Sequence, residues 1–223
     1  MKRTVSFFMI FVGILLTGCT HQLHITNSAE YFAPPATPTR QAIKLGVTSS
    51  SISDPQNSKY ISAIVDALQK NSSIERVIYP YNQAANKDMT DAVVDISVNA
   101  RYDGDGSNFF VNFPGWLIFA PAIWGYGYSA QIETLATVTS EKDGQSRQIT
   151  IPITYHFRQA AMNRTWTEVS WFEVGIIALV GGAVFTSYDT SVTDEFIQNA
   201  SPNYGPYVAK KIVSTACECL NVQ

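Results

Sequence analysis

Beyond residue 41, apolar and polar positions follow strand and helix periods in turn. Residues 42–48, 74–79 and 91–102 alternate apolar with polar side chains, which predicts three strands. Residues 60–70 carry one apolar stripe at i, i+3, i+4 and i+7, typical of an amphipathic helix: Ile61, Ile64, Val65 and Leu68. A polar loop is expected before this helix over 49–58, with Asp54-Pro55 as its turn. The expected order is β-α-β-β.

The later pattern predicts a hairpin and two helices. Residues 129–139 and 147–157 alternate again, and the Asp143-Gly144 pair between them is a strong hairpin signal. Residues 194–199 and 205–220 have helical spacing and are separated by Pro202. The sequence therefore predicts an α+β fold, in which a small β-α-β-β domain is extended by an antiparallel β meander and followed by C-terminal helices.

Composition narrows the range of functions. The chain has 223 residues, of which 46% are hydrophobic and 15% charged, enough to bury the core of a domain. With a formal charge of -3 and no basic block, it is not expected to bind nucleic acid. The sequence lacks the Gly-x-Ser-x-Gly, His-Glu-x-x-His and phosphate-loop motifs, so we expect no enzyme activity and no cofactor.

The N-terminus predicts export. Lys2 and Arg3 precede an apolar run from Val5 to Leu16, as in a secretory signal peptide. This run is shorter than the roughly 20 residues that a membrane-spanning helix needs. Leu16-Thr17-Gly18-Cys19 resembles the lipobox of bacterial lipoproteins, which implies cleavage between Gly18 and Cys19 and lipid attachment at Cys19.

This resemblance also implies a location. Cys19 would carry fatty acyl chains such as palmitate, and Thr20 stands where inner-membrane lipoproteins have Asp, so an outer-membrane, periplasm-facing protein is expected. Removal of residues 1–18 deletes two cations and no acid, giving a mature charge of -3 minus 2, or -5. Residues 19–41, which contain three prolines, are expected to form a flexible tether, and 42–223 a single α+β domain.

Residues 42–101 carry a second resemblance. Their strand, amphipathic helix, strand, polar loop and Asp-Ala-Val-Val-Asp-Ile-Ser-Val strand, on a lipidated chain, resemble a domain shared by three groups. These are TolB amino-terminal domains, the curli secretion lipoprotein and lipoprotein activators of penicillin-binding proteins. The order is also similar to that of the surface exclusion lipoprotein of conjugative plasmids. Several of these relatives form outer-membrane rings, which implies a homo-oligomer, although the membrane hairpins of a curli-type pore are missing.

Two uncharged segments, 109–128 and 174–185, are the most unusual feature of the sequence. Pro114 and Pro121 argue against a straight spanning helix in the first, and the second is too short to span. Either the two segments pack together and contact the outer membrane or an oligomer partner, or both belong to the core of a soluble domain. The contact residues expected in the first case are Trp116, Leu117, Ile118, Phe119, Trp124, Ile176, Ile177, Leu179 and Val180. Tyr126 and Tyr128 are also expected in the headgroup layer.

The remaining candidate metal ligands, cysteines and histidines are expected to have structural roles. Residues 103–108 begin like a calcium-binding loop. However, Asn108 stands where such a loop has its tight-turn Gly, and Pro114 stands where it has its bidentate Glu, so a Gly-rich turn without metal is expected. Cys217 and Cys219 would point to nearly opposite sides of a helix, as a strained local disulfide or as two buried thiols. His156 is interpreted as a structural strand residue.

The hypothesis that follows is a non-enzymatic, lipid-anchored outer-membrane lipoprotein that acts as an envelope assembly or interaction component. Its expected partners are membrane lipid, through acylated Cys19, and a protein of the envelope. Two alternatives stay open. One is a periplasmic regulator that binds an envelope enzyme through residues 42–101, and the other is a periplasmic hydrolase with a spatially assembled site.

Overall fold

The computed structural model describes residues 24–26, 28–32, 42–51, 53–112, 125–159 and 186–220. In chain order the elements are β1 (His24–Ile25), α2 (Ser28–Tyr31), β2 (Ile43–Ser49), α3 (Pro55–Gln69), β3 (Ile74–Ile78), α4 (Gln83–Asn86), the 3₁₀ turn η1 (Lys87–Met89), β4 (Ala92–Gly104), α5 (Asn108–Asn112), β5 (Tyr126–Ser140), β6 (Ser146–Gln159), the 3₁₀ turn η5 (Thr190–Val192) and α8 (Thr193–Cys219).

The contacts divide the chain into two units. Unit 1 comprises Met1–Thr26, Arg101–Ala130 and Thr154–Val192, and unit 2 comprises Asn27–Ala100, Gln131–Ile153 and Thr193–Gln223. β4, β5 and β6 each contribute residues to both units.

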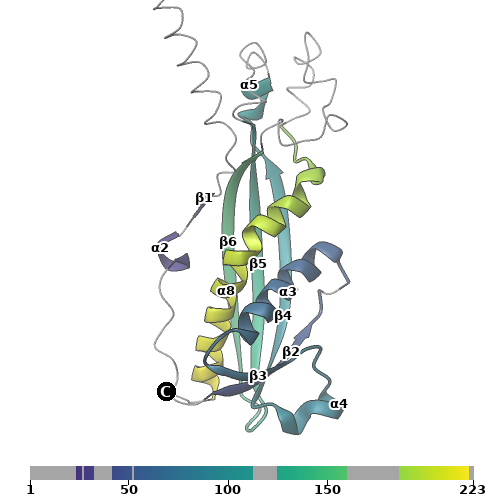
Figure 1. Ribbon diagram of the computed structural model, residues 1–223, viewed down its shortest axis with the longest axis vertical. Coiled ribbons are helices and arrows are strands. Elements are labelled where there is room, and N and C mark those ends of the chain that lie inside the picture. Colours follow the sequence, from purple (N-terminus) through teal and green to yellow (C-terminus); the bar gives the residue numbers. More distant parts are fainter. Residues whose placement is uncertain are drawn as a thin grey trace, which may run out of the picture. The chain divides into compact units, whose positions relative to one another are not determined.

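The strands form one mixed sheet in the order β1-β6-β5-β4-β2-β3 (Figure 1). β2 is parallel to both β3 and β4, whereas β1 is antiparallel to β6. β5 and β6 are joined by a tight turn, in which Gly144 adopts a φ of 72° that glycine tolerates without strain. The predicted α+β class, the β-α-β-β order and the meander are confirmed.

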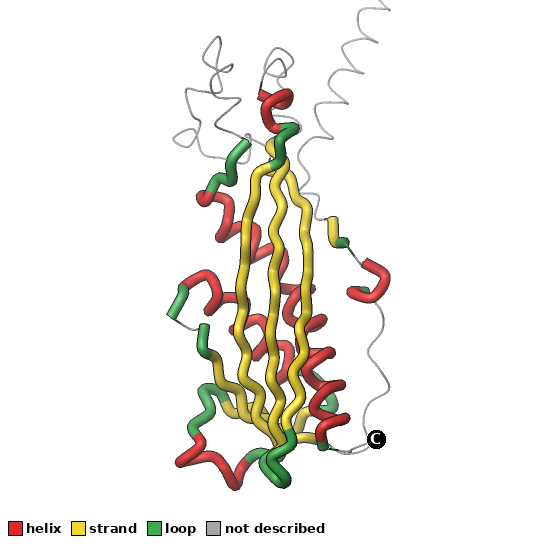
Figure 2. The backbone as a smooth tube through the Cα atoms, turned by 180° about the vertical axis from the view of Figure 1, so that it is seen from behind, coloured by secondary structure: helices red, strands yellow, loops and turns green. Residues whose placement is uncertain are grey.

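In unit 2, α3 and α8 lie on one face of the strands (Figure 2). The predicted stripe of α3 is buried, and so is one face of β5, where Ile132, Thr134, Ala136 and Val138 alternate with more exposed residues. α8 contributes a larger buried face: Phe196, Ile197, Ala200, Tyr204, Tyr207, Val208, Ile212, Val213 and Ala216. This layer of two helices on a sheet is the core of the unit.

The start of α3 differs from the prediction. Asp54 is the N-cap residue, whose Oδ1 accepts hydrogen bonds from the backbone N–H of Gln56 at 2.8 Å and of Asn57 at 3.3 Å. Pro55 is the first helical residue, a position where its missing N–H is not needed. The expected turn at Asp54-Pro55 was therefore wrong, because this pair begins the helix.

The C-terminal helix also differs. A single helix, α8, replaces the two that were expected on either side of Pro202, and it contains both Pro202 and Pro206. Both prolines are exposed, so water can reach the carbonyl groups that lose their partners, while the opposite face is buried. Gly205 lies so close to α3 that an added Cβ would approach the Ala63 carbonyl oxygen to 2.3 Å. Close packing of the two helices therefore outweighs the helix-breaking tendency of proline.

Candidate functional site

The predicted attachment and contact residues lie outside the described residues: Gly18, Cys19, Trp116, Leu117, Ile118, Phe119, Trp124, Ile176, Ile177, Leu179 and Val180. For the nine contact residues, the nearest described residues on either side all belong to unit 1. We call these flanks the root, made of residues 102–112, 125–128, 157–159 and 186–188. The root consists of the described residues on either side of 113–124 and of 160–185, the two stretches that contain the nine predicted contact residues.

A buried side-chain amide joins two flanks of the first apolar segment. The Asn108 Nδ2 donates to the Gly127 carbonyl at 2.8 Å, and its Oδ1 accepts from the Gly127 N–H at 2.6 Å. Asn108 is fully buried. Its amide therefore bonds to the Gly127 backbone as a neighbouring strand residue would, and fixes α5 to the start of β5.

A close backbone approach joins the flank of the second segment to the first. A Cβ on Gly104 would lie 2.2 Å from the Thr186 carbonyl oxygen, so only glycine allows this contact. Beside it, Tyr102 stacks on Tyr188, with ring centroids 5.0 Å apart. The root thus gathers flanks of both segments in one place.

Tyr126 and Tyr128 belong to the interior of the root. Tyr126 is fully buried and Tyr128 nearly so, and the Tyr128 ring contacts Phe157 at 5.5 Å and Tyr188 at 5.4 Å between centroids. Their predicted place in the headgroup layer was wrong, because both side chains are buried and the ring contacts enclose Tyr128. The last residues of the segment 109–128 are therefore core.

Asp105 is one of three charged residues of the root, with Asp103 and Arg158. Hydrogen bonds from Ser107, above all from its backbone N–H at 2.7 Å, hold the pKa of the Asp105 carboxyl below its usual range, and the charges of Arg158 and His156 add to this. A turn follows at Gly106-Ser107, so the Gly-rich turn predicted over 103–108 is confirmed there only, because β4 extends to Gly104 and α5 begins at Asn108. Within the described residues no cluster of three or more His, Cys, Asp or Glu could hold a metal ion.

In unit 2, α2 is attached to α8 by an ion pair and a ring contact. Tyr31 stacks on Tyr207 at 4.9 Å, and Lys211 pairs with Glu30. The hydrogen bond lowers the pKa of the Glu30 carboxyl and raises that of the Lys211 ammonium. Residues 28–32 thus contact the domain although they fall within the predicted tether.

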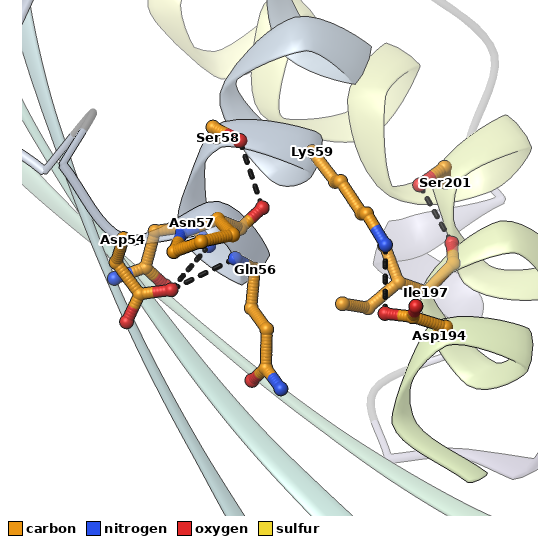
Figure 3. Close-up of polar contacts among 9 residues, drawn as sticks. Asp54, Gln56, Asn57, Ser58, Lys59, Asp194, Ile197 and Ser201 are labelled. Atoms are coloured by element: carbon orange, nitrogen blue, oxygen red, sulfur yellow. Dashed lines mark hydrogen bonds and ion pairs between the residues drawn. The ribbon is translucent and has the colours of Figure 1, made fainter. Parts of the chain in front are cut away.

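An open recess near the starts of α3 and α8 is lined by Lys59, Asp194, Glu195, Ile197, Gln198 and Ser201, and Figure 3 shows the polar contacts there. Lys59 Nζ lies 2.7 Å from Asp194 Oδ1, and both side chains are exposed. The nearby Ser201 hydroxyl donates to the Ile197 carbonyl at 2.6 Å, so it is held by backbone rather than by a general base. The recess is therefore lined by an exposed ion pair and by a serine that is bonded within α8.

The two C-terminal cysteines, at the end of α8, are thiols and are not joined in a disulfide. Cys219 is buried, with its sulfur 3.4 Å from the Gln145 carbonyl oxygen, while Cys217 is half-buried. Of the two expected alternatives, the structure has thiols rather than a disulfide.

None of the helices in the described ranges has the length and apolarity needed to cross a bilayer. Neither a known family model nor a curated protein matches the chain. Two solved structures, both PelC dodecamers from Paraburkholderia phytofirmans, are similar to it. One, a PelC variant, has 10% identity and a TM-score of 0.32, covering 92% of this chain and 100% of that chain. The other has 9% identity and a TM-score of 0.29, covering 92% and 99%. Scores this low establish neither a shared fold nor a shared role.

Proposed function

We propose that this chain is a lipid-anchored protein of the bacterial outer membrane that acts without catalysis, through contacts with lipid and with envelope proteins. The observation that carries the proposal is the N-terminal sequence. A cationic start, a short apolar run and Leu16-Thr17-Gly18-Cys19 follow one another in the order that lipoprotein export requires.

The root supports a contact role. It brings flanks of two uncharged segments together in unit 1, by the Asn108 amide and by the close approach of Gly104 to Thr186. Long uncharged segments that share one origin can form a continuous apolar surface, which is the kind of surface that membranes and protein partners cover. A homo-oligomer is one way of covering it.

The experiment that tests the anchor is metabolic labelling with an alkyne analogue of palmitate in a Gram-negative host, followed by membrane fractionation. The wild-type chain should be labelled and should sediment with the outer membrane, and Cys19→Ser should be neither labelled nor membrane-bound. Cys217→Ser is the matched control and should behave as wild type. Label that persists in Cys19→Ser would overturn the proposal.

The non-catalytic part has its own test. A serine-hydrolase probe should leave the intact chain unlabelled. Covalent labelling that disappears when one serine is changed would contradict this part and favour the hydrolase alternative.

A further inference from the structure

We propose that unit 1 docks on a zwitterionic lipid surface through the turn and short helix at residues 105–111, with Phe110 entering the headgroup layer. We call these residues the tip. The proposal rests on the anchor at Cys19 proposed above and adds the orientation of unit 1 on the membrane.

The first step is the direction in which the chain enters the sheet. β1 is antiparallel to β6, with His24 opposite His156 and Ile25 opposite Tyr155. The chain therefore enters β1 from the Gln159 end of β6 and runs toward Ser146. His24 is five positions after Cys19, and five steps of about 3.4 Å each can span about 17 Å at most. The acylated residue is thus confined to the neighbourhood of β1.

The second step places the tip at the same end of unit 1. β5 and β6 are neighbouring strands joined by a tight turn, so the first residues of β5 lie beside the last residues of β6. The Asn108 amide holds α5 on Gly127, near the start of β5 (Figure 1). The entry point of the chain and the tip therefore share one end of the β5-β6 pair.

The third step is the surface that the tip presents. Phe110 is 68% exposed, the most exposed large hydrophobic side chain among the described residues, and Phe109 supports it in an edge-to-face contact at 5.4 Å. The Asn108 amide and the Asp105–Ser107 hydrogen bond already fix the tip, so its insertion would cost little conformational entropy. Aromatic rings on a fixed support are suited to the membrane interface.

The charges of the chain indicate which kind of lipid the tip contacts and how deeply the tip enters the membrane. The mature chain carries a formal charge of -5, from -3 minus the two cations Lys2 and Arg3, so anionic headgroups would repel it. Asp105 is exposed and its carboxyl has a lowered pKa, so it is ionised at neutral pH and needs water. The tip is therefore expected in the headgroup layer of zwitterionic lipid and not in the hydrocarbon.

The test uses the mature, acylated chain in vesicles of phosphatidylcholine and phosphatidylethanolamine, with Cys217→Ser and Cys219→Ala as background. An environment-sensitive fluorophore is attached to the cysteine of Phe110→Cys. Its emission wavelength is measured, together with the quenching of its fluorescence by lipids that carry a nitroxide near the headgroup. Phe32→Cys is the matched comparison, because Phe32 is also an exposed phenylalanine, at 63%, and lies on the other side of β1 along the chain. Gly106→Cys gives a second tip position, where an added Cβ meets no atom within 4 Å.

We expect a blue shift at positions 110 and 106 and quenching about twofold stronger than at 32, as for groups held at the depth of the headgroups. Equal, weak quenching at all three positions in a chain that is acylated and vesicle-bound would overturn the docking while leaving the anchor intact. A blue shift at 110 without nitroxide quenching would show that a second copy covers the tip, and would also overturn it. A chain that is not acylated would instead contradict the proposed function.

Discussion

Unit 2 and unit 1 share three strands but are stabilised in different ways. In unit 2, side chains at regular spacing bury one face of the strands under α3 and α8. In unit 1, a few individual contacts hold the flanks of the root: the Asn108 amide on Gly127, the approach of Gly104 to Thr186 and the Tyr102–Tyr188 stack.

Mutations in the two units should act in different ways. A periodic core distributes its stability over many side chains, so its loss lowers the stability of the whole fold. A region held by a few specific contacts can open locally when one of them is removed. Substitutions in the two units should therefore differ in kind as well as in size.

The largest effect is expected from Ile64→Ala in α3. Ile64 is fully buried in the core of unit 2, and removal of such a side chain costs about 2–5 kcal/mol of unfolding free energy. Urea denaturation of the mature Cys19→Ser chain measures it. Ser62→Ala, exposed on the same helix, is the control and should change stability by less than about 0.5 kcal/mol. Equal effects of the two would contradict the packing of α3.

The next effect is expected from Gly205→Ala, which tests the close contact of the two helices. The new methyl group would meet the Ala63 carbonyl oxygen, so α3 and α8 must separate, at a cost of about 1–3 kcal/mol. Gly106→Ala is the matched control, because its Cβ has open space around it. If Gly205→Ala unfolds at the same urea concentration as Gly106→Ala, the helices do not approach as described.

Asn108→Ala should act locally in unit 1. It leaves the Gly127 N–H without its acceptor, while the Gly127 carbonyl keeps the bond from the Asp105 N–H at 3.0 Å, at a cost of about 1–3 kcal/mol in local opening. Hydrogen exchange followed by mass spectrometry should show faster exchange at 125–128 and unchanged exchange at 61–68. Asn99→Ala, exposed on β4, should change neither region. Faster exchange in both regions would contradict the view that the Asn108 contacts stabilise unit 1 locally.

The smallest effect concerns the pH range of the α2 contact. The pKa of Glu30 is lowered, so its contribution is present above about 4.3 and is lost as the pH falls through the lowered value. The pKa of Lys211 is raised, so its contribution is present below about 10.4 and is lost as the pH rises through the raised value. The contact should therefore persist between these limits.

Carbon NMR titration of the glutamate side chains checks this pH dependence. The Glu30 carboxyl should titrate below the ordinary range, and Lys211→Met should return it to that range. A Glu30 midpoint that does not respond to Lys211→Met would show that the ion pair does not form in solution.

Much of the fold could be predicted because its core follows simple periods. The alternation of Val94, Ile96, Val98 and Ala100 marked β4, in which the first three are buried, and the stripe of α3 marked its buried face. Two predicted helix boundaries were wrong, each at a residue or pair that is compatible with two kinds of structure. Asp54-Pro55 can form a turn or begin a helix, and Pro202 can end a helix or lie on its exposed side.

The root could not be predicted, because its contacts join residues far apart in sequence. No local signal pairs Asn108 with Gly127, or Gly104 with Thr186. The aromatic character of Tyr126 and Tyr128 suits a membrane interface and a packed core equally well. The two-residue strand β1 is too short to show a period. The anchor at Cys19 and the nine contact residues of the apolar segments stay predictions.

The most direct test of anchoring is the intact mass of the chain extracted from membranes of a lipoprotein-processing host, together with a mass spectrum of its N-terminal peptide. We expect a chain that begins at Cys19, with a diacylglyceryl group on the thiol and an acyl group on the amine. A chain that begins at any other residue, or an unmodified Cys19, would contradict a lipid-anchored envelope protein.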